Sequence, residues 1–430
     1  MRVIHEWGTK PGRIEFTLIP EPNLGDNTFA HYQRCQLQLV RRSFAILLPN
    51  SIRCFEDVHP DVWALVIVLS LLPFVGSRLH LSFAVTEKFA KIVALTGREV
   101  QPTDAHLVHR VACVDDGVSE PGLRQSVAFN GRAHATICAA TMGTVNTVLC
   151  YVDHWNTSAR VMNSSDNVYA SLDHMMHVGF EAKIVKTDVQ TLVDPPAFAT
   201  LLGSCIGCVL LSDVLHTGTV AIGSRLIDLH SFGSALRVIS FKSGDLHVGG
   251  DRTDAPIKYE NSILFWRELF DAVGLVLQTP TCGLPDTLTV LMLKRNRLME
   301  YVTLCGSAEA RLDYACGVCA DCLYYNTLVS NISSTTSVDR VWRIAQDRHP
   351  HALASVADLD VASPWHLFWL TMVTREELAP REMRKLLRYR RMLCDRRYKW
   401  HPDGARIGAP TQSDNLQSII LRLMQSVRTQ

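Results

Sequence analysis

The stretch Cys305-Gly-Ser-Ala-Glu-Ala-Arg-Leu-Asp-Tyr-Ala-Cys316-Gly-Val-Cys319-Ala-Asp-Cys322 brings four cysteines together with the spacing C-x10-C-x2-C-x2-C. Thiolates are soft ligands that suit zinc, and short x2 spacings let one turn present several sulfur atoms to a tetrahedral centre. The pattern predicts a structural zinc site bound by Cys305, Cys316, Cys319 and Cys322, with free or redox-active cysteines as the alternative. Because such a site is closed to water, we expect the zinc ion to stabilise the fold and to perform no chemistry.

Composition sets broad limits on the class of protein. The chain has 430 residues, 47% of them hydrophobic, so two or three domains with a large core are expected. The formal net charge of +1 gives no global attraction to nucleic acid or to a membrane surface. A metal-binding cluster among 13 cysteines, and a start without the apolar segment of a signal peptide, favour a reducing, cytoplasmic compartment. The apolar stretch Val62–Val75 is too short to span a bilayer and contains Pro73, so it is interpreted as a buried helix and no membrane partner is expected.

Residues 1–120 are predicted to form an N-terminal α+β domain. Turn residues from Gly117 to Gly122 mark its expected boundary with the next domain. The expected elements are strands at Arg13–Ile19, Gln36–Leu48 and Leu79–Val85, and a helix at Val62–Leu72.

Residues 123–335 alternate between strand-like and helix-like segments. This alternation predicts an α/β fold with a parallel sheet that has helices on both faces. Ligands of such sheets bind beyond the carboxyl ends of the strands, and Phe129–Thr136 follows the first strand. The expected strands are Ser126–Phe129, Thr147–Val152, Ala182–Val185, Val220–Ile222 and Val276–Gln278, and the expected helices are Ile137–Met142, Asp166–Val178, Pro196–Leu215 and Ser262–Val273.

Residues 336–430 are predicted to form a helical tail with a basic segment at Pro380–Lys399. Tyr389, Tyr398 and Trp400 are interleaved with its arginines and lysines or follow them directly. This composition is typical of a solvated helix face or of a surface that docks onto an acidic protein partner. Binding to RNA is the other interpretation, because basic side chains neutralise phosphates and aromatic rings stack on bases.

The order of these segments and the late cysteine cluster resemble one family over roughly residues 123–335. It is the 7-cyano-7-deazaguanine synthase (QueC) group of the PP-loop ATP pyrophosphatases. The resemblance implies a PP-loop fold, a zinc knuckle, ATP and Mg²⁺ as cofactors, and a nucleotide or a deazapurine-like small molecule as ligand. Members activate a carboxylate by adenylation and form a carbon–nitrogen bond. Asp188 matches an acidic position that follows the family's third strand.

The ATP loop of that family reads Ser-Gly-Gly-x-Asp-Ser, and this chain departs from it. The corresponding residues are Asn130, Gly131, Arg132, Ala133, His134 and Ala135, so only one glycine is retained. Asn130, Gly131, Arg132, His134 and Thr136 remain candidates to contact a phosphate at a helix N-terminus, and a remnant loop that holds no ligand is the alternative interpretation. The departures predict weak or absent ATP pyrophosphatase activity. An impaired enzyme and a catalytically inactive binding subunit, a pseudoenzyme, are therefore the two competing hypotheses.

Other candidate residues are weighed against structural roles. Asp153 and His154 follow a strand and are candidates to face a ligand. Cys205 and Cys208 form a second CxxC pair inside an apolar stretch, which favours a place in the core. Structural roles are also favoured for Cys282, which has no evident base nearby, and for the loop histidines His349 and His351.

Overall fold

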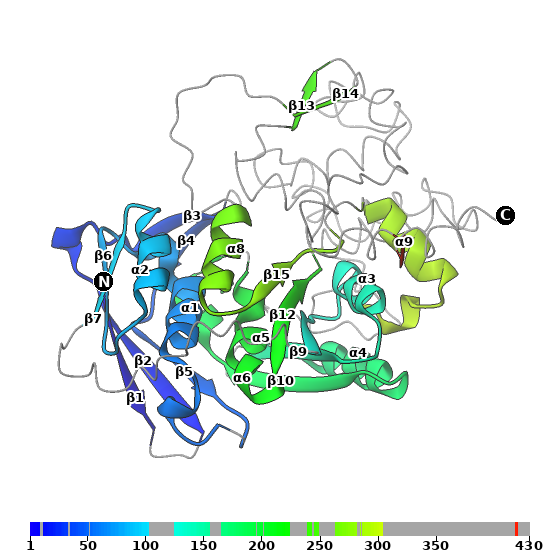
Figure 1. Cartoon of the computed structure of the whole chain (residues 1–430), viewed down its shortest axis with the longest axis horizontal. Helices are drawn as coiled ribbons and strands as arrows, with labels where there is room; N and C mark the ends of the chain where they lie inside the picture. Colours follow the sequence, from blue (N-terminus) through cyan, green and yellow to red (C-terminus); the bar gives the residue numbers. More distant parts are fainter. Residues whose placement is uncertain are drawn as a thin grey trace, which may run out of the picture.

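A ten-stranded mixed sheet forms the centre of the structure, a computed structural model of the chain (Figure 1). Its strand order is β15-β12-β8-β9-β10-β5-β2-β1-β6-β7. The structure describes residues 1–102, 124–154, 165–223, 239–248, 263–303 and 418–419, except residues 9–11, 33–34, 51, 195, 201, 243–244, 282–283 and 285.

The strands are short to medium in length. Those of the large sheet are β1 Arg2–Trp7, β2 Arg13–Ile19, β5 Ser43–Leu47, β6 Arg78–Leu81, β7 Glu99–Pro102, β8 Arg124–Ala128, β9 Thr147–His154, β10 Glu181–Thr187, β12 Thr217–Ile222 and β15 Val276–Gln278. Smaller sheets contain β3 Phe29–Tyr32, β4 Cys35–Leu39 and β11 Val193–Asp194, and separately β13 Ile239–Lys242 and β14 Asp245–Val248.

The helices connect and cover these strands. The α-helices are α1 Pro60–Leu71, α2 Glu87–Ala94, α3 Ala133–Met142, α4 Ser165–His177, α5 Ile206–Leu210, α6 Ser212–Leu215, α8 Ile263–Ala272 and α9 Asp286–Arg295. Short 3-10 turns are η1 Pro22–Leu24, η2 Phe55–Asp57, η3 Leu72–Phe74, η5 Val189–Leu192, η6 Gly203–Cys205 and η9 Met299–Tyr301. Within the described residues, no helix is long and apolar enough to cross a membrane.

The strands from β8 onward in the large sheet are parallel to one another, as the alternating sequence pattern predicts. Successive residues of β9 enter different hydrophobic clusters, because side chains of a strand point to opposite faces. Leu149 packs in the cluster with α3 and α4, whereas Val148 and Cys150 pack in the cluster with α5 and α8. The prediction of helices on both faces of a parallel sheet is therefore confirmed.

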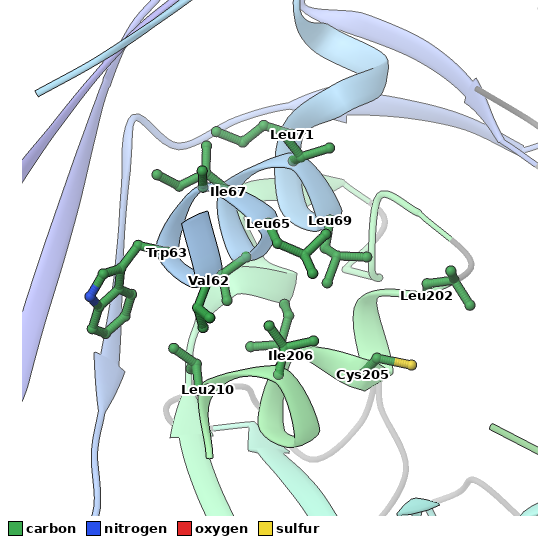
Figure 2. Packing of buried hydrophobic residues seen from close by; sticks show 14 of the residues in the cluster. Val62, Trp63, Leu65, Ile67, Leu69, Leu71, Leu202, Cys205, Ile206 and Leu210 are labelled. Carbon is green, nitrogen blue, oxygen red and sulfur yellow. The ribbon is translucent and has the colours of Figure 1, made fainter. Parts of the chain in front are cut away.

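The N-terminal strands continue the same sheet. Strand β5 pairs antiparallel with β10, with Thr187 opposite Ile46, and β2 and β1 follow as antiparallel neighbours. Helix α1 packs against α5, and Figure 2 shows Leu65 and Leu69 of α1 gathered near Ile206. Residues 1–102 and the parallel half thus share one sheet and one core. The domain boundary at residue 120 lies outside the described residues and stays a prediction.

Two predicted elements are wrong. The single strand Gln36–Leu48 is two strands, β4 and β5, because the buried positions change phase from Leu37 and Leu39 to Phe44 and Ile46. The long helix Pro196–Leu215 is replaced by η6, α5 and α6. Its first part is held by tertiary contacts: Thr200 Oγ1 donates a hydrogen bond to the Leu69 carbonyl of α1 at 2.5 Å, and the Ala197 N–H donates to the Gln190 carbonyl at 3.1 Å. These contacts override the helix propensity of the segment.

Candidate functional site

The centre of the parallel half is a topological switch point. Numbered in chain order from β8, its strands lie in the order 3-2-1-4-5 when β10 is placed first, as the sheet order β10-β9-β8-β12-β15 shows. The chain first adds strands on the β9 side of β8 and then crosses to the β12 side. In open α/β sheets a crevice forms beyond the carboxyl ends of the two strands where the order reverses, and ligands bind there. Here those two strands are β8 and β12.

The loop after β8 follows the carboxyl end of this strand and leads into α3. Gly131 adopts φ +71°, in the left-handed region that favours glycine. The Asn130 side chain stabilises the turn, because its Oδ1 accepts a hydrogen bond from the Arg132 N–H at 3.1 Å. Gly223 follows β12 directly, and a Cβ added there would lie 2.4 Å from the backbone of His134. The close approach of Gly223 sets the first turn of α3 against the end of β12.

Thr303 packs against the same loop from a distant part of the chain. Its N–H and its Oγ1 both donate to the Gly131 carbonyl, at 2.7 and 2.9 Å. A Cβ added to Gly131 would lie 2.1 Å from Thr303 Oγ1. Thr303 is itself buried, and Ser171 of α4 donates from its hydroxyl to the carbonyl of nearby Tyr301. The segment after α9 therefore fixes the conformation of the loop.

The five loop residues predicted as ligand contacts occupy two environments. Asn130 and Arg132 are half-buried at the loop, and Gly131 is buried between them. His134 and Thr136 are 4% and 0% exposed. Thr136 Oγ1 donates to the Arg132 carbonyl at 3.1 Å, so its hydroxyl is engaged within the first turn of α3. The structure thus brings these residues together, but it buries His134 and Thr136.

Asp188 is positioned away from this loop. Strand register puts Ala128 beside Cys150, whereas Thr187 lies beside His154, roughly 13 Å further along the sheet. Asp188 Oδ1 accepts a hydrogen bond from the Ala45 N–H of β5 at 2.6 Å, and its Oδ2 lies 3.7 Å from Arg41 Nη1. These contacts attach the end of β10 to β5, which lies on the side of β10 away from β9 and β8 in the sheet.

Asp153 and His154 are the last two residues of β9, whereas the sequence predicted that they directly follow this strand. Tyr169 of α4 donates its hydroxyl proton to Asp153 Oδ2 at 2.8 Å, and burial followed by this carboxylate raises the Tyr169 pKa well above its usual value. His154 lies among aromatic rings, with ring centroids 6.4 Å from Tyr151 and 6.0 Å from Phe198. Burial lowers the His154 pKa to about 4, against a smaller opposing effect of Asp153. His154 is therefore neutral at physiological pH.

The cysteine predictions divide by position. Cys205 and Cys208 are fully buried, which confirms their place in the core, and burial raises the pKa of the Cys205 thiol. The four proposed zinc ligands Cys305, Cys316, Cys319 and Cys322 lie outside the described residues, as do Cys282, His349, His351 and the basic segment at 380–399. Among the residues that the structure does describe, no group of three or more His, Cys, Asp and Glu side chains could hold a metal ion.

Two residues at the site were missed by the sequence interpretation. Thr303 lies in a short link between α9 and the cysteine cluster and carries no local motif. Gln278 ends an otherwise apolar strand, and a polar residue buried at a strand end in this fold was the available signal.

The comparisons with known proteins match part of the chain. A family of unknown function (DUF6395) matches residues 265–358. That span contains most of α8, all of β15 and α9, Thr303 and the cysteine cluster. It therefore includes both residues that the sequence interpretation missed. No curated protein and no solved structure matches the chain.

Proposed function

We propose that the chain binds a nucleotide through its phosphates at the crevice between β8 and β12, as a QueC-like PP-loop homologue with impaired ATP chemistry. In this proposal it belongs to deazaguanine-type or related ATP-dependent carboxylate activation. The observation that carries the proposal is the Gly131 loop leading into the N-terminus of α3 at the topological switch point.

Phosphate binding is supported by the local charge distribution. The first N–H groups of an α-helix have no partner within the helix and carry the positive end of its dipole. Helix α3 begins at Ala133, directly after the loop, and Arg132 occupies its N-cap position. An arginine offers a planar fork of donors that suits phosphate oxygens. Backbone donors and Arg132 together form a site for an anion.

Magnesium fits the loop less well than phosphate does. Mg²⁺ is bound by carboxylates and phosphate oxygens, and the family's aspartate position is His134 here. Two carboxylates at neighbouring strand ends have other partners: Asp153 accepts from the Tyr169 hydroxyl, and Asp188 accepts from the Ala45 N–H. The described loop residues thus supply no carboxylate for a metal. We therefore expect weak or absent magnesium-dependent pyrophosphate release.

The test of phosphate binding is calorimetry with ATP, AMP and inorganic pyrophosphate. Arg132→Ala should weaken the binding of ATP and pyrophosphate by about 10-fold to 100-fold, because a hydrogen bond to a charged group contributes about 1.5–3 kcal/mol. Arg78→Ala is a matched control, because Arg78 of β6 pairs with the exposed Glu99 of β7. Absence of nucleotide and pyrophosphate binding by the unaltered protein contradicts the proposal.

Activity is tested separately from binding. Restoring the family sequence with Asn130→Ser, Arg132→Gly, His134→Asp and Ala135→Ser should strengthen nucleotide binding and increase magnesium-dependent pyrophosphate release. Robust release by the unaltered protein would show that its loop supports catalysis after all.

A catalytically inactive binding subunit is the second candidate function. It is favoured by the burial of His134 at the aspartate position of the family loop. Such a subunit binds nucleotide without turnover, so it predicts binding of ATP together with no release of pyrophosphate from either the unaltered protein or the restored loop. Binding of RNA or of a protein partner through the basic segment at 380–399 is tested by its loss on deletion of that segment.

A further inference from the structure

Gln278 is a buried amide without a partner at the end of β15. Its side chain is 1% exposed. Neither its Oε1 nor its Nε2 has a hydrogen-bond partner in the structure, and Gln190, also buried, has an Oε1 without a partner. A buried polar group without a partner costs stability, and native proteins rarely retain one without a reason. The missing partners of both amide atoms therefore indicate that a bound polar group hydrogen-bonds to Gln278 in the complete site.

The strand register gives the direction of the Gln278 side chain. Gln278 lies beside Ala221 of β12, and paired residues of parallel strands point to the same face of a sheet. Ala221 packs in the cluster that contains Ala135 of α3. Gly223 lies on the same face two residues later, in contact with the first turn of α3. The side chain of Gln278 therefore lies on the face of the sheet that α3 covers, and the N-terminus of α3 is the proposed phosphate site.

The segment that follows Gln278 is also polar and buried. Thr279 and Thr281 are each 0% exposed, as is Thr289 on α9. This polar segment connects β15 to α9, and α9 packs against α3. Buried polar side chains thus surround the end of β15 in the sequence, next to Gln278.

We propose that Gln278 recognises the base of the bound nucleotide, and this inference rests on the proposed function. A carboxamide presents one acceptor and two donors in a single plane. Glutamine uses this arrangement to read the adjacent acceptor and amino group of adenine through two hydrogen bonds. The ligand class is a purine-type base carrying a neighbouring donor and acceptor, either as part of a nucleotide or as a separate deazapurine-like substrate.

The experiment compares ligands with and without a base. Binding of ATP, adenosine and inorganic pyrophosphate is measured by calorimetry for the unaltered protein and for Gln278→Met, which keeps the length of the side chain. The expected result is a loss of about tenfold or more in affinity for ATP and adenosine with no change for pyrophosphate. Gln190→Met is the matched control and should leave all three affinities unchanged. If the base is a separate substrate, 7-deazaguanine binding falls and ATP binding is kept.

Each outcome has a distinct meaning. Unchanged affinity of Gln278→Met for ATP, adenosine and 7-deazaguanine overturns this inference and leaves the proposed function standing. Absence of ATP and pyrophosphate binding by the unaltered protein overturns both. Gln278→Leu provides a second variant should the first fail to fold. The unliganded Gln278→Met protein should also melt at a temperature equal to or above that of the unaltered protein, because the change removes an unpartnered buried amide.

Discussion

Replacing Gly131 with alanine tests how the loop after β8 is held. Gly131 has φ +71°, and an alanine in the left-handed region costs about 1–2 kcal/mol. The added Cβ would lie 2.1 Å from Thr303 Oγ1, so the Thr303 hydroxyl must move and lose its hydrogen bond to the Gly131 carbonyl. That loss adds about 1 kcal/mol or more. The expected decrease in the free energy of unfolding is therefore about 2–4 kcal/mol.

Gly97→Ala separates backbone strain from the contact with Thr303. Gly97 has φ +78°, and an added Cβ there meets no atom within 4 Å. This control should lose about 1–2 kcal/mol from backbone strain alone. Urea denaturation followed by circular dichroism measures both variants, and an unchanged dependence on urea concentration validates the comparison.

A double-mutant cycle with Thr303→Ala identifies the contact itself. Because alanine at 303 removes the atom that clashes, Gly131→Ala should cost about 1 kcal/mol less in the Thr303→Ala background than in the unaltered protein. Equal costs in the two backgrounds, or a Gly131→Ala variant no less stable than Gly97→Ala, would refute the reasoning.

Three further predictions concern the metal, the pH dependence and Asp188. Freshly purified reduced protein should contain about one equivalent of zinc by elemental analysis. The zinc should be lost in Cys319→Ala and kept in Cys208→Ala, a control in the core. Absence of the metal from the unaltered protein contradicts the zinc proposal. Because burial lowers the His154 pKa from 6.5 to about 4, the unfolded chain takes up the proton first as the pH falls, and the free energy of unfolding should decrease by about 3 kcal/mol between pH 6.5 and 4 through this residue. Stability curves of His154→Phe and the unaltered protein that run parallel over this range would contradict the assignment. Asp188→Ala should destabilise the protein by about 1–3 kcal/mol, since it leaves the Ala45 N–H unpaired. The same change should leave nucleotide affinity unchanged. A loss of affinity at constant stability would show that Asp188 contacts the ligand.

Local patterns predicted the parallel half of the fold well. A short apolar run predicted β8, and the run of small residues after it predicted α3. Helices α4 and α8 end just before Gly179 and Gly274, which adopt positive φ. The sequence did not predict that the strands of residues 1–102 belong to the same sheet. It depends on the pairing of Thr187 with Ile46, and no local pattern encodes a partner so distant in the chain.

The candidate site was predicted in part for a similar reason. The position of the loop at a strand end follows from the order of segments, but the burial of His134 depends on contacts with distant elements. Asp188 has a residue type that suits a ligand or an interstrand contact equally, and only the hydrogen bond to Ala45 distinguishes them. Gln278 carries no motif, because its significance lies in the lack of a partner.

The one glycine that the loop shares with the PP-loop pattern has a structural explanation of its own. Gly131 is required by its positive φ and by the contact with Thr303, whether or not a phosphate is bound. Gly223 is likewise required by its approach to the first turn of α3. These glycines therefore support the architecture of the crevice and are neutral about its ligand. Gln278 is different, since neither backbone conformation nor close packing requires an unpartnered amide at a strand end. Substitution of Gln278, or of Arg132 at the helix N-cap, therefore tests nucleotide binding more directly than any change to the glycines.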